Sequence, residues 1–283
     1  MISGPRDIAL TGVPRSGTTL CCRLLGQAPD TVALFEPMDV HRLPAGDHAR
    51  AVRDVRGFFD QSRRSLLERG SATSQQVDGV VPDNPFESTF GVDGARRRQA
   101  TLGTIAVDKP LTAGFTLVVK HNAAFTALLP ELAAAFEVYA LVRNPLATLA
   151  SWNSVDLPVT QGRLPMGERL DPALTLRLDA ASGRFERQLV ALDWLFSRFA
   201  AHLPATRILR YEEIVASRGR SLRETCAIDI APLPLHSRNA SPLYDAVACR
   251  GLADRLFDDG GAWRRFYGDD DLRRTLAELE RGA

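Results

Sequence analysis

The sequence predicts an α/β fold, in which a parallel sheet is flanked by helices, from three observations. Short apolar runs typical of buried strands occur at 7–11, 31–35, 116–119 and 138–142. Helical patterns separate these runs, and alternation of strand with helix favours parallel pairing. A turn rich in Gly, Pro and Ser joins the first run to the first helical pattern, which makes a strand–loop–helix unit.

The amino-terminal elements follow from the residue pattern. After the first strand, a helix is expected from residue 18 to about 27, because leucines recur on one face of this segment. The second strand, 31–35, is expected to end at Glu36, because Pro37 cannot continue a central strand.

Residues 41–114 break this regularity. They hold arginine-rich helical fragments, a polar stretch at 71–78 and a turn-rich segment around 82–85. We expect an irregular, mainly helical insertion or lid here, within one domain that spans residues 1–283. The length and apolar content of the chain suit a single core of that size.

The carboxyl-terminal half returns to strands and helices. Pro130 is expected near a helix start. Asn144 is a good N-cap and Pro145 suits the first helical position, so a helix is expected through Ser151. The remaining expected elements are an amphipathic helical segment at 172–202, a strand at 207–210, and a helical stretch from 252 that glycines interrupt at 260–261.

Composition and charge argue against several classes of protein. The formal net charge is +1 and neither half is acidic or basic, so binding of nucleic acid by bulk electrostatics is not expected. No apolar stretch approaches the ~20 residues of a membrane span. Without the pattern of a secretory signal, we expect a cytoplasmic protein. The four cysteines match neither a zinc site nor a disulfide framework.

The loop Gly12-Val13-Pro14-Arg15-Ser16-Gly17-Thr18-Thr19 carries the first sign of function. It nearly fits the phosphate-binding pattern GxxxxGK[ST], but Thr18 stands where that pattern has lysine. Glycines let the backbone wrap around an anion, and the following helix directs its positive end at the same point. Because Arg15 supplies a cation from within the loop, we expect a P-loop-type anion site. The alternative is a glycine-rich turn without a ligand.

Two later strands lead into cations. The run 116–119 leads into Lys120-His121, and the run 138–142 leads into Arg143. A magnesium-dependent kinase would be expected to place an aspartate at such a strand end. Since the carboxyl ends of parallel strands share one sheet edge, where open α/β folds bind ligands, we expect a metal-free site for a multiply charged anion.

The loop at 14–20 resembles the 5′-phosphosulfate loop of sulfotransferases that use 3′-phosphoadenosine 5′-phosphosulfate (PAPS). An arginine at a strand end with a serine eight residues later, as in Arg143 and Ser151, is similar to the 3′-phosphate motif of this family. The run 26–37 looks more like carbohydrate sulfotransferases than like the cytosolic enzymes that act on phenols and steroids. The resemblance implies that the donor contacts Pro14, Arg15, Ser16, Gly17, Thr18, Thr19, Arg143 and Ser151.

Two further segments are similar to motifs of this family. Arg210-Tyr211-Glu212 resembles its tyrosine–glutamate motif, which implies that Tyr211 lies near the adenine; the alternative is an ordinary capped helix start. The segments at 250–251 and 261–264 resemble the closing segment of the 3′-phosphate pocket, with a longer interval between its halves than in the cytosolic members. The resemblance implies Arg250 and Trp263 as further donor ligands.

A general base must take the proton of the acceptor hydroxyl, and the sequence offers competing candidates. Glu36 is the first choice, because it matches a carboxylate position of the carbohydrate-type relatives; the alternative is a capping or ion-pairing glutamate. His121 is the second, although it lies one residue closer to Lys120 than the histidine of the cytosolic enzymes does. Such a shift can turn a side chain to the other side of an extended segment. His41 is the third.

The remaining cations have expected roles as well. Arg15 is expected to stabilise the leaving phosphate, and Lys120, one of only two lysines, the transferring sulfuryl oxygens. The alternative for Lys120 is a surface cation that caps the strand end. The run Arg96-Arg97-Arg98 is interpreted as a solvated loop, which an acidic polysaccharide acceptor could also use.

The leading hypothesis is therefore a metal-independent sulfotransferase that uses PAPS and releases 3′-phosphoadenosine 5′-phosphate (PAP). Its acceptor is expected to be a hydroxyl of a carbohydrate, a glycolipid or a small metabolite. One alternative is a divergent P-loop kinase that uses ATP and magnesium. Another is a nucleotide-binding interaction module without catalysis.

Overall fold

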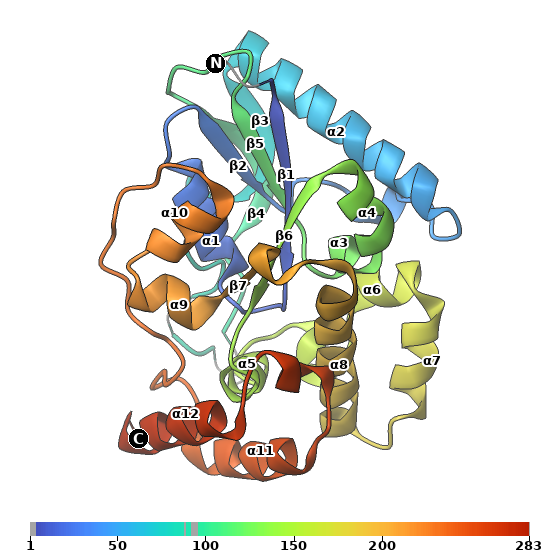
Figure 1. Ribbon diagram of the computed structural model, residues 1–283, viewed down its shortest axis with the longest axis vertical. Helices are drawn as coiled ribbons and strands as arrows, with labels where there is room; N and C mark the ends of the chain where they lie inside the picture. Colours follow the sequence, from blue (N-terminus) through green and yellow to red (C-terminus); the bar gives the residue numbers. More distant parts are fainter. Residues whose placement is uncertain (1–3, 88, 92–95, 283) are drawn as a thin grey trace.

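A five-stranded parallel sheet forms the centre of the computed structural model, which describes residues 4–87, 89–91 and 96–282 (Figure 1). The strands are β1 (Arg6–Gly12), β2 (Thr31–Phe35), β5 (Thr116–Lys120), β6 (Glu137–Val142) and β7 (Ile208–Arg210). Their order is β2-β5-β1-β6-β7, and all neighbouring pairs are parallel. The predicted α/β class is confirmed.

Each central strand is buried on both faces. In β1, Ile8 and Leu10 belong to one hydrophobic core and Ala9 to the other, because successive side chains point to opposite faces of the sheet. A strand that is covered on both faces has a continuous run of apolar residues. For this reason, the strands predicted from the sequence lie close to those of the structure.

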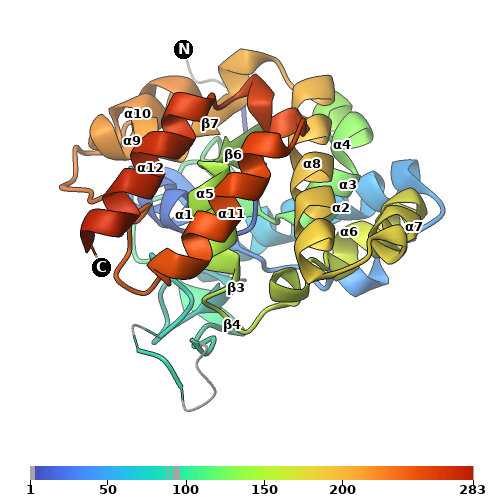
Figure 2. The same cartoon turned by 90° about the horizontal axis from the view of Figure 1, so that it is seen from below.

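Helices cover both faces of this sheet, with a third group beyond its carboxyl edge (Figures 1 and 2). One face carries α1 (Thr18–Gly26), α9 (Tyr211–Ala216) and α10 (Arg220–Cys226). The other carries α2 (His48–Arg69), α3 (Ala123–Ala127), α4 (Leu129–Ala135) and α8 (Arg184–His202), with α6 (Pro165–Leu170) and α7 (Pro172–Ala180) outside them. Beyond the edge lie α5 (Pro145–Trp152), α11 (Ala246–Asp258) and α12 (Asp269–Gly282). Short 3-10 turns are η1 (Val40–Arg42), η2 (Pro158–Gln161), η3 (Ala205–Arg207) and η4 (Ala262–Arg265).

Residues 41–114 are more regular than the sequence predicted. Helix α2 has 22 residues and buries an apolar stripe that includes Val55 and Phe59. Arg63 ties it to the first strand, with Nη2 2.6 Å from Oδ1 of Asp7. This helix is therefore part of the layer that covers the sheet. The many arginines on its outer face hid the stripe from the sequence pattern.

An antiparallel pair, β3 (Ser71–Gln76) and β4 (Thr101–Ala106), follows α2. Ser74 attaches it to the edge strand, because its Oγ accepts a hydrogen bond of 3.0 Å from the backbone N of Phe35. Between β3 and β4, residues 83–87 and 96–100 lie beside each other, with Arg98 paired to Phe86; we call these residues the cover segment.

The helical predictions in the carboxyl-terminal half are largely confirmed. Asn144 caps α5, since its Oδ1 accepts from the backbone N of Leu146 at 3.0 Å. The amphipathic segment at 172–202 is two helices, because α7 ends at Ala180 and α8 starts at Arg184 after a Ser-Gly turn. The last helical stretch starts six residues before the expected 252, at Ala246, and the break at the glycines is present.

Candidate functional site

A cavity of about 280 Å³ lies at the carboxyl edge of the sheet, beside the start of α1. Its walls come from the β1–α1 loop, the ends of β2 and β5, the cover segment and the loop 234–244. The connection after β1 leads toward β2, and the connection after β6 leads toward β7 on the other side. Ligands of open α/β sheets bind at such a point of reversal.

The β1–α1 loop is tightly wound. A Cβ on Gly12 would lie 2.5 Å from the carbonyl oxygen of Leu141, so only glycine fits this close approach of two strands. Gly17 has a φ of +94°, and a Cβ there would lie 2.8 Å from Cδ2 of Tyr211. Helix α1 begins at Thr18 without a side-chain cap. Its first N–H groups therefore provide an anion-binding terminus at the cavity.

Arg15 extends from this loop along the cavity wall, and its own φ is +70°. Its Nε donates to Oγ of Ser151 at 3.2 Å, and its Nη1 donates to Oδ1 of Asn84 at 3.3 Å. The guanidinium also stacks on Phe86, with 4.6 Å between Cζ and the ring centroid. Burial, together with neighbouring arginines, lowers the pKa of Arg15 to about 9. The hydrogen-bond partners of Arg15 among the described residues, Ser151 and Asn84, are uncharged.

Arg143, at the end of β6, is buried and organises the loops of the cavity. Its Nε donates to Oδ1 of Asn239 at 2.8 Å, and its Nη1 donates to the carbonyl oxygen of Arg15 at 2.9 Å. Its Nη2 donates to the carbonyl oxygen of Arg238 at 2.6 Å. Arg143 therefore contacts the backbone of Arg15, whereas Ser151 contacts its side chain. Arg143 lines the cavity, but Ser151 is fully buried and does not line it.

Tyr211 lies against the β1–α1 loop. Its ring contacts Gly17 and the guanidinium of Arg143, with 4.8 Å between Cζ and the ring centroid. Its hydroxyl accepts a hydrogen bond of 3.0 Å from the backbone N of Arg238. Tyr211 thus lies in the wall of the cavity.

Glu36 is ion-paired at the end of β2. Its Oε1 lies 2.6 Å from Nζ of Lys120, and its Oε2 lies 3.2 Å from Nη2 of Arg98. Burial acts to raise the pKa of Glu36, but Lys120, His121 and Arg98 lower it to about 2. Lys120 is only 2% exposed, and burial lowers its pKa. Both side chains line the cavity, and Glu36 adopts a left-handed φ of +41°.

The two histidine candidates do not line this cavity. Nε2 of His121 accepts a hydrogen bond of 3.2 Å from the backbone N of Met38, and its ring packs on Phe125. Burial lowers the pKa of His121 to about 4. The shift by one residue therefore turns this side chain into the core. His41 is exposed in η1, outside the cavity.

The arginine run in the cover segment is not the solvated loop that the sequence predicted. Arg96 is 4% exposed and donates from Nη2 to Oγ of Ser154 at 2.9 Å, while Arg98 pairs with Glu36. Arg97 is exposed, and Arg98 is exposed in part although it pairs with Glu36. Alternate residues of an extended segment face one side, so Arg96 and Arg98 both reach the cavity.

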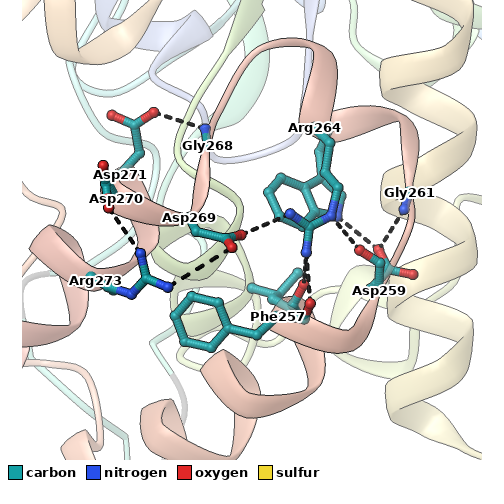
Figure 3. A network of polar contacts seen from close by, with 11 residues as sticks. Phe257, Asp259, Gly261, Arg264, Gly268, Asp269, Asp270, Asp271 and Arg273 are labelled. Atoms are coloured by element: carbon teal, nitrogen blue, oxygen red, sulfur yellow. Dashed lines mark hydrogen bonds and ion pairs between the residues drawn. The ribbon is translucent and has the colours of Figure 1, made fainter.

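Arg250 and Trp263 are not brought to the cavity. The side chain of Arg250 is 64% exposed and pairs with Glu280 on α12. Trp263 is buried, and its Nε1 donates to Oδ2 of Asp259 at 2.7 Å. Figure 3 shows the polar network around Arg264 in the same region. Arg238 and Tyr244, from the loop 234–244, line the cavity instead. These two residues were not predicted from the sequence.

The cavity wall is strongly cationic. Among the described residues, the cationic side chains of the wall are Arg15, Arg96, Arg98, Lys120, Arg143 and Arg238, and the carboxylates are Glu36 and Asp83. Six cations against two carboxylates favour a ligand with several negative charges.

Among residues 4–87, 89–91 and 96–282, no group of three or more His, Cys, Asp or Glu side chains could hold a metal ion. In the same part of the chain, no helix combines the length and the apolar character that crossing a membrane requires.

Comparisons with known proteins gave structural similarity only. No protein-family model matches the chain, and no curated protein does. The sulfotransferase from Alicyclobacillus acidocaldarius is 12% identical with a TM-score of 0.42, over 99% of this chain and 96% of that chain. Sulfotransferases STF1 from Mycobacterium tuberculosis H37Rv and STF9 from Mycobacterium avium are 12% and 13% identical, each with a TM-score of 0.35. Both comparisons cover 99% of this chain and 77% of the mycobacterial one. The fold class rests on the sheet and helix layers of this chain itself.

Proposed function

We propose that this chain is a metal-independent sulfotransferase that moves a sulfuryl group from PAPS to an acceptor hydroxyl. The observation that carries the proposal is the cavity in which six cationic side chains surround the uncapped start of α1. PAPS has anionic groups at both ends, a 5′-phosphosulfate and a 3′-phosphate. The donor set of the cavity fits such a molecule, because backbone N–H groups and guanidinium groups both favour anionic oxygens.

The donor would be held from three directions. The loop 14–19 would bind the phosphosulfate, and Tyr211 would contact the adenine. Arg143 and Ser151 would bind the 3′-phosphate, and both contact Arg15. The donor supplies the activated sulfuryl group, so the protein has to position the reactants and stabilise charge.

Three side chains of the cavity would carry the chemistry. Arg15 and Lys120 neutralise negative charge, and Glu36 takes the proton of the acceptor hydroxyl. With a pKa of about 2, Glu36 is a weak base while Lys120 and Arg98 both pair with it. An anion that draws these cations away would raise the proton affinity of Glu36, which would make it a base only in the loaded site.

The acceptor would be a hydroxyl of a carbohydrate, a glycolipid or a small metabolite, and the enzyme would act in the cytoplasm as a single domain. Neither nucleic acid nor a membrane span enters this proposal. A screen with radiolabelled PAPS against saccharide, lipid and small-molecule acceptors tests it. Donor binding without any sulfated product would favour the non-catalytic module instead.

Calorimetry tests the donor directly. PAP should bind tightly in EDTA and much more tightly than ADP, because only PAP carries the 3′-phosphate. Equal affinities for PAP and ADP would rule out the proposal. A requirement for magnesium together with ATP turnover would instead identify the divergent kinase.

A further inference from the structure

Arg96 is a buried cation whose hydrogen-bond partners among the described residues are neutral. Its side chain donates to Oγ of Ser154 at 2.9 Å and to the carbonyl oxygen of Ser154 at 3.4 Å. No carboxylate of the described residues lies within 4.0 Å of its guanidinium. Burying a charge without a counter-ion is unfavourable, so this arrangement favours the binding of an anion.

Two more arginines share this wall of the cavity. Arg143 lies 3.5 Å from the hydroxyl of Tyr244 through Nη2, and Arg15 donates to Oγ of Ser151 at 3.2 Å. Neither guanidinium pairs with a carboxylate of the described residues. Burial acts to raise the pKa of Tyr244, but Arg143, Ser151 and Arg15 lower it, which reflects the positive potential at this wall.

The anchor of Arg96 lies next to the predicted 3′-phosphate ligands. Ser154 follows Ser151 by three residues, and its Oγ donates to the carbonyl oxygen of Ser151 at 2.9 Å. The backbone of Arg96 also pairs with Val155 in a parallel bridge. These contacts fix Arg96 beside Ser151 at the end of α5, whereas Arg98 pairs with Glu36.

We propose that Arg96 is a further ligand of the donor 3′-phosphate and sets the preference for nucleotides that carry it. The inference rests on the proposed function, since the dianion that completes the arginine wall is taken to be that phosphate. A phosphate would supply the anionic partner that the guanidinium lacks among the described residues. Because Arg96 belongs to the cover segment, the same contact would hold that segment over the bound nucleotide.

The test compares PAP with AMP, which lacks only the 3′-phosphate. For Arg96→Gln, the affinity for PAP should fall about 10–100-fold, the loss expected for one charge-assisted hydrogen bond, while the affinity for AMP stays unchanged. Arg97→Gln is the matched control, because Arg97 is exposed in the same segment and should change neither affinity. If Arg96→Gln keeps the wild-type ratio of PAP to AMP affinity, Arg96 is not a 3′-phosphate ligand.

Stability without ligand separates this role from a structural one. Removing a buried cation that has no carboxylate partner among the described residues should leave the Tm of ligand-free Arg96→Gln equal to or above the wild-type value, whereas loss of a structural contact would lower it. Arg96→Lys keeps the charge and should recover part of the preference for PAP. A lower Tm with the preference retained overturns the inference. If the wild-type protein itself does not prefer PAP over AMP, the proposed function fails as well.

Discussion

Two arginines of the cavity differ from the arginines of the carboxyl-terminal region in the charge of their hydrogen-bond partners. Around η4 and α12, Arg264 pairs with Asp269 at 2.7 Å and Arg273 pairs with Asp270 at 2.8 Å (Figure 3). Among the described residues, the partners of Arg15 and Arg143 in the cavity are amides, hydroxyls and carbonyls. The carboxyl-terminal arginines are therefore paired within the fold, and we propose that Arg15 and Arg143 keep their charge for a ligand.

The largest expected effect comes from Glu36, the cavity carboxylate that pairs with both Lys120 and Arg98. Glu36→Ala should lower kcat by about 10²–10⁴-fold, the range for loss of a general base. PAP affinity should change far less, as calorimetry on the same variant would show. If Glu36→Ala retains full turnover while His121→Ala abolishes it, the assignment of the base is wrong.

Arg15 is expected to show the next largest effect. Arg15→Ala should reduce kcat about 10²–10³-fold, because the leaving phosphate loses a charge that the site holds ready. Turnover should suffer more than PAP affinity, since the loop backbone remains. A variant with wild-type kcat would show that the guanidinium only fills space between Asn84 and Ser151.

Arg264→Ala tests the role of an ion-paired arginine that lies outside the cavity. Its guanidinium donates to the carbonyl oxygens of Asp259 at 2.6 Å and Phe257 at 2.7 Å, besides pairing with Asp269. We expect a loss of about 1–3 kcal/mol in the free energy of unfolding, because several charge-assisted bonds disappear. Urea titration measures this loss, and PAP affinity should stay unchanged. A loss of affinity at unchanged stability would reverse the comparison.

The ion pair of Glu36 should also make stability depend on pH. Since its pKa is lowered from 4.5 to about 2, the stability that it adds is complete above about pH 4.5 and is lost as the pH falls toward 2. The wild type should therefore lose about 1–2 kcal/mol more than Glu36→Gln over this interval. Denaturant titrations of both proteins at pH 6, 4 and 3 measure the difference, and parallel pH profiles would contradict it.

Arg250→Ala should have the smallest effect. Its pair with Glu280 is solvent-exposed, so the free energy of unfolding should change by less than about 0.5 kcal/mol. PAP affinity should remain at the wild-type value, because the side chain does not line the cavity. A clear drop in affinity would restore the role that the sequence resemblance implied for this residue.

The sequence was informative where local pattern decides structure. The strands of the central sheet, the glycine loop and the start of α5 all depend on neighbouring residues, such as Asn144 before Pro145. The roles of Arg96 and Arg238 depend on contacts far along the chain, for example Arg96 with Ser154. Only the two-residue spacing of Arg96 and Arg98 hinted that both face one side of an extended segment.

The amphipathic stripe of α2 and the position of Arg250 outside the cavity were not predicted from the sequence. In both cases, packing decides which side of a helix is buried. Arginines on the outer face of α2 obscured its buried positions, although Val55 and Phe59 have helical spacing. Arg250 was assigned by its likeness to a motif, but α11 packs on α5 and α12 and leaves that side chain in solvent. Motif likeness cannot give the rotation of a helix about its axis, which packing decides.

The left-handed backbone at Arg15 and Glu36 has a consequence for engineering. With φ values of +70° and +41°, the backbone at both residues adopts a conformation that costs about 1 kcal/mol or more for residues other than glycine. A search for thermostable variants that ignores activity should therefore favour glycine at Arg15, whereas at Glu36 the loss of the ion pair with buried Lys120 opposes this gain. The proposed leaving-group cation would then be the first group lost, because its backbone conformation lowers the stability of the fold.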